Sequence, residues 1–144
     1  MQKATPIQLK TLEGDPISLL EQYKNKPLLI LFFNLQCLGC TGRAIPLAYE
    51  YLHEFEGLEV LAIHSQFNDK EVTKQEILDI FTSKSLPFPI YFDKGHEAYS
   101  QYECEGTPHW ILVNKDGYVY RSIYGSQNGA QTRLGYALAD LVAR

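Results

Sequence analysis

Two stretches of the chain are apolar at nearly every position, which is typical of strands buried on both faces of a sheet. They are residues 27–33, PLLILFF, and residues 58–65, LEVLAIHS. Between them, apolar side chains recur at helical spacing over about residues 38–55, and Gly57 follows as a candidate C-terminal cap. This order of strand, amphipathic helix and strand predicts a βαβ unit.

The same reading of hydrophobic periods extends to the rest of the chain. A three-residue turn, KDG, joins two apolar runs in the second half and favours a hairpin. The pattern predicts helices at about 70–84, 95–102 and 130–142, and strands or extended segments at 88–93, 109–114 and 118–125.

The N-terminal segment alternates apolar and polar residues over positions 6–12, then turns through EGDP into ISLLEQY. This pattern predicts a small β-hairpin that leads into the domain. With 144 residues, the chain has the length of one domain, residues 1–144. Together the elements predict a three-layer α/β fold, with a mixed central sheet, helices on both faces and an N-terminal hairpin.

Composition and charge narrow the class of protein. Apolar residues make up 45% of the chain and charged residues 21%, and the net charge is −4. An acidic chain is not suited to nucleic acid as its main partner. The longest apolar stretch is far too short to span a bilayer, and the N-terminus has no segment of signal-peptide type. We therefore expect a cytoplasmic protein by default, or an extracytoplasmic one if a leader has been removed.

The candidate chemistry lies in the sequence CLGC, where Cys37 and Cys40 follow the first buried strand and begin its helix. A helix N-terminus presents unpaired N–H groups and a partial positive charge, which favour a thiolate over a thiol. Cys37 is better placed for this effect, and Cys40 lies within disulfide reach of it. The pattern favours a redox couple in which Cys37 attacks and Cys40 resolves the mixed disulfide.

Two other interpretations of the cysteine pair stay open. The two residues could be small buried side chains without a redox role. They could also be half of a zinc site, with Cys104, His109 and His64 as recruits, although the chain has no second closely spaced pair of ligands. We expect no metal.

A second signal is GTPHWILV, in which Thr107 and Pro108 stand directly before a predicted strand. With this segment, the chain resembles the thioredoxin superfamily, and within it the TlpA-like and AhpC/TSA redoxin branch. The motifs that carry the resemblance are KPLLILFF, CLGC, the helix proline Pro46, FPIYFD, GTP before a strand, and VNKDG. The resemblance implies a thioredoxin-like fold, with a cis peptide at Pro108 and a Thr107–Pro108 loop that faces the disulfide and pairs with the substrate backbone.

The resemblance also implies a function, that of a thiol–disulfide oxidoreductase. It would act on protein or small-molecule disulfides, take electrons from a reducing partner, and need no cofactor beyond its own dithiol. Two alternatives are a peroxiredoxin-like thiol peroxidase and a non-catalytic interaction module. A peroxidatic cysteine has Thr or Ser three residues before it and Pro seven before it. The positions before Cys37 are Asn34 and Ile30, and those before Cys40 are Cys37 and Phe33, so the peroxidase pattern is missing.

The sequence departs from the family at four positions. Gln36 stands where the family usually has Trp, Arg43 where TlpA-like proteins often carry an acid, and Leu31 where thioredoxins have a buried aspartate. Pro46 follows Cys37 by nine residues, one more than usual. The helix is therefore expected to hold a bulge or an extra residue near its start.

Four residues are auxiliary candidates. Arg43 could favour the Cys37 thiolate if it folds back toward it. His64, at the end of a central strand, could act as a general base or simply cap a loop. Cys104 could be a third redox thiol or a small buried side chain, and His109 could flank the thiols or merely begin its strand.

Overall fold

Eight strands form one mixed sheet in the computed structural model, which describes all residues 1–144. The strands are β1 (Gln2–Lys3), β2 (Gln8–Lys10), β3 (Pro16–Ser18), β4 (Leu28–Phe33), β5 (Glu59–His64), β6 (Ile90–Phe92), β7 (His109–Val113) and β8 (Tyr118–Tyr124). The helices are α1 (Leu19–Gln22), α2 (Ile45–Glu54), α3 (Lys74–Leu78), α4 (Glu97–Gln101) and α5 (Asn128–Ala143), with a π-helical turn at Cys40–Ala44.

The sheet has the strand order β1-β8-β7-β4-β5-β6-β2-β3. Strands β4, β5 and β6 run parallel, whereas β7 and β8 on one side and the β2–β3 hairpin on the other run antiparallel to their neighbours. Because parallel strands β4 and β5 pair as far as Phe33 and His64, their carboxyl ends meet at one edge of the sheet. That edge holds the site described below.

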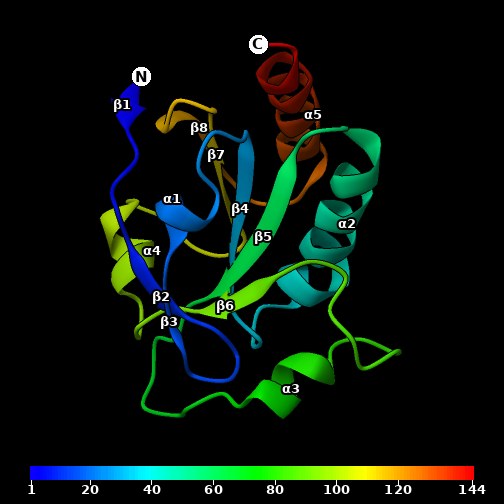
Figure 1. The fold of residues 1–144 in the computed structure, drawn as a ribbon. Coiled ribbons are helices and arrows are strands. Elements are labelled where there is room, and N and C mark those ends of the chain that lie inside the picture. Colours follow the sequence, from blue (N-terminus) through cyan, green and yellow to red (C-terminus); the bar gives the residue numbers. More distant parts are fainter.

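Strand β4 lies at the centre, and all six of its residues are buried. Its alternate residues point into two separate cores, one under α2 and α5 and the other under α1 and α4. Figure 1 shows α2 and α5 on one side of the sheet and α1 and α4 on the other. The expected three-layer α/β fold with an N-terminal hairpin is confirmed.

The predicted helix at 70–84 is wrong in length, because α3 covers only Lys74–Leu78. It starts at Thr73, whose side chain forms a reciprocal capping box with Glu76. The helix ends early, and Lys84 adopts a left-handed conformation with φ of 56°. Turns therefore replace the last part of the predicted helix.

Two strands also differ from the prediction. The extended segment expected at 88–93 pairs only at Ile90–Phe92. At the N-terminus, the two exposed residues of β1 pair with β8 and had no strand pattern of their own. Strand β1 lies at the edge of the sheet and β6 lies between β5 and β2, but the bounds of both short strands depend on the partners they pair with, which local periodicity does not describe.

The helix after the cysteines runs over residues 38–54, and its segment Cys40–Ala44 is π-helical. The backbone N–H of Ile45 donates to the carbonyl of Cys40, five residues back. Pro46 comes next and has no N–H to donate, so the wider turn stands where an α-helical bond is missing anyway. The extra residue expected from the position of Pro46 is therefore confirmed as a π turn.

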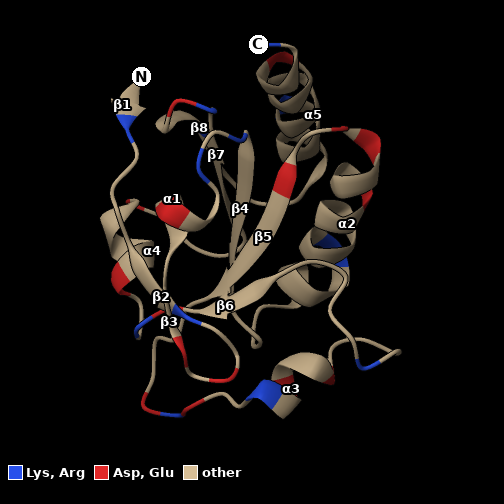
Figure 2. Ribbon diagram, in the orientation of Figure 1, with Lys and Arg blue, Asp and Glu red and all other residues tan.

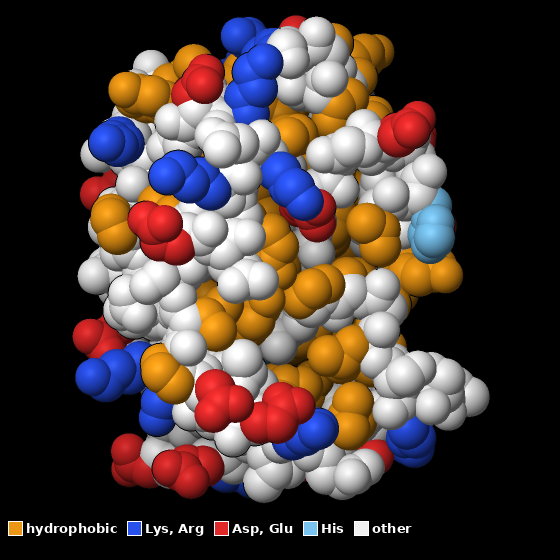
Figure 3. All heavy atoms as spheres, in the orientation of Figure 1, with side chains coloured by type: hydrophobic (Ala, Val, Ile, Leu, Met, Phe, Trp, Pro, Cys, Tyr) orange, Lys and Arg blue, Asp and Glu red, His pale blue; other side chains and the backbone are white.

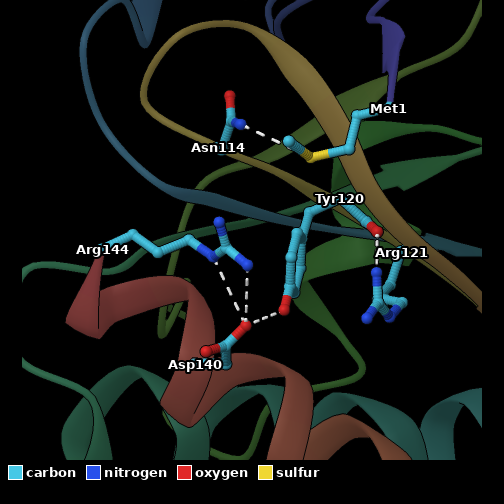
Figure 4. A network of polar contacts seen from close by, with 6 residues as sticks. All are labelled: Met1, Asn114, Tyr120, Arg121, Asp140 and Arg144. Atoms are coloured by element: carbon cyan, nitrogen blue, oxygen red, sulfur yellow. Dashed lines mark hydrogen bonds and ion pairs between the residues drawn. The ribbon is translucent and has the colours of Figure 1, made fainter.

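The far end of α5 is tied to β8 by a polar cluster (Figure 4). Asp140 accepts from the Tyr120 hydroxyl and pairs with Arg144 at 3.2 Å. The guanidinium of Arg144 also lies over the Tyr120 ring, 4.8 Å from its centroid. These contacts hold the C-terminal turn of α5 against the sheet, at the opposite end of that helix from Asn128.

Charged residues lie on the helices, loops and sheet margins, whereas β4 and β7 carry none (Figure 2). Figure 3 shows apolar side chains along the middle of one face, with most charged ones around them. None of the helices combines the length and the apolar character needed to cross a bilayer.

Candidate active site

The loop that precedes Cys37 is fixed by Asn34, the first residue after β4. The Asn34 side chain accepts from the backbone N–H of Gln36 at 2.8 Å and donates to the carbonyl of Ser65 at 2.8 Å. The backbone N–H of Cys37 donates to the Asn34 carbonyl at 3.0 Å. This Asx-type turn links the ends of β4 and β5 and sets where the helix begins.

The two thiols differ in access to solvent. Cys37 is half-buried, whereas Cys40 is 0% exposed and packs in the core under α2. The backbone N–H of Cys40 donates to the sulfur of Cys37 at 3.2 Å, a contact that would stabilise negative charge on that sulfur. Burial, together with the hydrogen bond to the Cys37 thiol, raises the pKa of Cys40 to about 12. Cys37 is the thiol that a substrate can reach.

The Thr107–Pro108 peptide is cis, as the family resemblance implied, and it lies against the dithiol. The Cys37 thiol donates to the Thr107 carbonyl at 3.4 Å. The structure thus brings together four of the predicted site residues, Cys37, Cys40, Thr107 and Pro108.

His109 begins β7 and is 2% exposed. Its Nδ1 accepts from the backbone N–H of Glu105 at 3.2 Å, so its Nε2 carries the proton and donates to the Ser122 hydroxyl at 2.7 Å. Burial lowers the pKa of His109, which keeps the ring neutral and able to accept. His109 therefore anchors the loop before Pro108 and has its ring nitrogens engaged away from the thiols.

His64 plays a similar part on the other loop. Its Nε2 accepts from the backbone N–H of Leu35 at 3.2 Å, and its ring packs edge-on against Phe33. The side chain is 2% exposed, and burial lowers the pKa of His64 to about 4. The ring nitrogen that a general base would use is thus directed at the backbone two residues before Cys37.

The start of α5 closes the site from the side of Pro108. The backbone N–H of Gly125 donates to the Pro108 carbonyl at 2.9 Å, and the buried Trp110 indole donates to the Gly125 carbonyl at 2.7 Å. Between this junction and the dithiol runs an open groove of about 570 Å³. Cys37 and Arg43 both line it, and Arg43 is exposed.

Cys104 is not part of this arrangement. It packs in the core under α1 and α4, on the other face of the sheet from Cys37 and Cys40. Burial raises the pKa of Cys104 to about 12. No three side chains among His, Cys, Asp and Glu converge as a metal site would require. The recruits considered for zinc therefore lie apart.

Sequence reasoning missed three residues that shape the site: Asn34, Ser126 and Arg133. A signal existed for the first two. Asn34 directly follows a buried strand, and Ser126 follows the last strand of the sheet, where polar residues commonly form sites. Arg133 had none, because its approach to the groove depends on how α5 crosses the sheet.

The fold and the paired thiols place the chain in the thioredoxin-like class of proteins. Within that class, the AhpC/TSA family matches residues 1–122, and the chain belongs to that family. The resemblance inferred from the motifs is thereby confirmed.

A curated relative matches most of this chain. The thiol-disulfide oxidoreductase ResA of Bacillus thuringiensis subsp. konkukian is 29% identical over 122 residues, which is 83% of this chain and 66% of that protein. The chain thus spans just under two thirds of the length of this relative.

Solved structures show the same fold. A crystal structure of the thioredoxin-like superfamily protein SPOA0173 superposes with a TM-score of 0.82 at 24% identity, covering 100% of this chain and 98% of the other. A thiol-disulfide isomerase from Corynebacterium glutamicum superposes with a TM-score of 0.77 at 23% identity, covering 98% and 97%.

Proposed function

We propose that the chain is a thiol–disulfide oxidoreductase in which Cys37 attacks the substrate and Cys40 resolves the mixed disulfide. One observation carries the proposal. The sulfur of half-buried Cys37 lies 3.2 Å from the backbone N–H of fully buried Cys40 and 3.4 Å from the Thr107 carbonyl. An accessible thiol paired with a sheltered one beside a cis-proline loop suits two successive exchange steps.

In the first step, the Cys37 thiolate attacks one sulfur of a substrate disulfide. A Cys37–substrate disulfide forms, the substrate S–S bond breaks, and the first substrate thiol leaves. In the second step, the Cys40 thiolate attacks the Cys37 sulfur and releases the second substrate thiol. The products are a Cys37–Cys40 disulfide and two substrate thiols, so the substrate gains two electrons and two protons.

The Thr107–Pro108 loop would hold the substrate backbone in an extended form beside Cys37. The Thr107 carbonyl takes the Cys37 thiol as its donor in the reduced protein, and it becomes available once that sulfur enters a mixed disulfide. The dithiol itself carries the two electrons, so the proposed reaction requires no bound cofactor. A reducing partner with its own dithiol must regenerate it.

The proposal is tested by equilibrating the protein with glutathione or dithiothreitol buffers of graded potential and following the disulfide by mass. We expect one two-electron transition that joins Cys37 to Cys40. A midpoint near about −270 mV is typical of a reductant, and one near about −120 mV of an oxidant. The midpoint thus also decides the direction of electron flow and whether a reducing or an oxidising compartment suits the protein.

Two variants sharpen the test. Cys40→Ser should accumulate a mixed disulfide at Cys37, because the resolving thiol is missing, whereas Cys37→Ser should form none. Cys104→Ser, which changes the third cysteine, is the matched control. Failure to form a Cys37–Cys40 disulfide at any potential would contradict the proposal, as would rapid hydroperoxide-dependent oxidation without exchange.

A further inference from the structure

The groove beside Cys37 differs in charge from the rest of the molecule. Two arginines from different helical segments, Arg43 and Arg133, line it together with Cys37 and Pro108. No Asp or Glu is among the lining residues. The chain as a whole has a net charge of −4, so the positive charge beside the accessible thiol is a local feature of the groove.

Neither arginine is neutralised by the protein. Both side chains are exposed, and neither takes part in the ion pairs of the structure, which are Lys26–Glu59, Lys74–Glu13, Lys84–Asp79 and Arg144–Asp140. Each guanidinium can therefore turn its planar donor fork toward a ligand in the groove without breaking an ion pair.

The N-terminus of α5 adds donors to the same groove. This helix has 16 residues, and its first turn has no side-chain cap from Gln127. Gly129 and Ala130, in that turn, line the groove. Uncapped N–H groups at a helix N-terminus favour an anion.

A serine hydroxyl faces the same groove. Ser126 is only 5% exposed, and the part that reaches the surface includes its hydroxyl, which makes no hydrogen bond within the protein. Its oxygen lies in the groove wall opposite the helix that carries the dithiol, 3.6 Å from where a Cβ on Gly39 would stand. Glycine at position 39 keeps the space above Ser126 open. A hydroxyl at the groove surface without a protein partner is free to donate to a ligand that accepts a hydrogen bond.

We propose that this groove binds a carboxylate, so that Cys37 prefers disulfides that carry a carboxylate a few atoms from the sulfur. The proposal rests on the proposed exchange function and deepens it by naming the substrate class. Because the groove is continuous with Cys37, one molecule can place its carboxylate in the groove and its disulfide at Cys37. An acidic residue beside a half-cystine and the carboxylates of glutathione both satisfy this chemistry.

The test compares disulfides that differ only in charge. Three short peptide disulfides carry Glu, Gln or Lys beside the half-cystine, and the second-order rate of their reaction with the reduced protein is measured at low and high salt. We expect Glu to react about three- to tenfold faster than Gln at low salt, with Lys slowest, and the differences to shrink at high salt. Equal rates for the three peptides would overturn the proposal, and this comparison needs no variant.

Variants locate the effect. Arg133→Ala and Arg43→Ala should each bring the Glu-to-Gln rate ratio closer to one, and the double variant should bring it to about one. Arg121→Ala is the matched control, since it removes the same charge from a side chain that lies over Tyr120 and outside the groove. A ratio unchanged in the double variant, or lowered as much in Arg121→Ala, would contradict the assignment to the groove.

Glutathione disulfide is used to distinguish the two possible sources of the carboxylate, a small molecule and an acidic polypeptide. If its rate depends on Arg43 and Arg133 as the Glu peptide does, a small-molecule carboxylate suffices; if only the peptide responds, the groove reads an acidic polypeptide. If the protein reacts with the Gln peptide disulfide but shows no preference for the Glu peptide, the exchange function is supported and the carboxylate site is contradicted. If it reacts with none of the disulfides, both the exchange function and the carboxylate site are contradicted.

Discussion

The backbone N–H of Glu105 donates to Nδ1 of His109 at 3.2 Å, so a buried neutral imidazole holds the loop that carries the cis proline. His109→Phe should therefore cost about 1–3 kcal/mol of unfolding free energy, because it leaves that N–H without an acceptor. We expect disulfide exchange to slow as well, since the loop beside Cys37 loses its anchor. Urea unfolding and exchange kinetics measure the two effects.

The control for this prediction is Ser122→Ala, which removes only the partner of the other ring nitrogen. His109→Gln should fall between the two, because its amide oxygen can still accept from the Glu105 N–H. A His109→Phe protein as stable and as fast as Ser122→Ala would show that the anchor does not matter.

His64 should make stability depend on pH. Its pKa is lowered to about 4 in the folded protein by burial, against about 6.5 in the unfolded chain, so the unfolded state binds more protons between these values. Stability from this group is complete above pH 6.5 and is lost as the pH falls through 4, on the order of 3 kcal/mol in total. The lowered pKa of His109 acts in the same direction.

Chemical denaturation of the wild type and His64→Gln across this pH range isolates the contribution. Glutamine cannot titrate there but can still accept from the Leu35 N–H, so the free energy of unfolding should vary less with pH in the variant. The same pH dependence in both proteins would contradict a neutral, buried His64.

Gly106 should not accept a side chain without cost. A Cβ at this position would stand 2.7 Å from Cε1 of Tyr124, and the backbone φ is 156°. The Tyr124 ring is exposed and can move aside, so the main cost of Gly106→Ala is the backbone conformation, roughly 1–3 kcal/mol. Adding Tyr124→Ala should therefore restore little of the lost stability, as thermal unfolding would measure. Full recovery in the double variant would show that the steric contact dominates instead.

Cys104→Ser should leave the redox chemistry unchanged. Cys104 lies across the sheet from the other two cysteines, and burial raises its pKa to about 12, which keeps it protonated. Intact-protein mass after mild oxidation should show the same Cys37–Cys40 disulfide in the variant and the wild type. A disulfide that includes Cys104 in the wild type would contradict this expectation.

Local patterns were enough to predict the layers of the fold and the place of the dithiol. The unbroken apolar run of β4 predicts burial on both faces of the sheet. The number of residues from Cys37 to Pro46 predicts an extra residue in the helix. The length of α3 could not be predicted from the sequence, because the early end of this helix depends on the turns that follow it. The roles of His64 and His109 could not be predicted either. Each ring accepts a hydrogen bond from a backbone N–H that only the folded sheet brings close to it.

The π turn at Cys40–Ala44 also has a consequence for how the dithiol is aimed. One added residue changes the angular phase of a helix by about 100°, so the side chains before the turn and those after it follow two different phases. The residues from Ile45 onward follow the packing of the core, whereas Cys37, ahead of the turn, is positioned by the loop before it and faces the groove. The direction of Cys37 and the packing of α2 are thus set by different segments of the chain, and Cys40, buried in the core at the start of the π turn, connects the two.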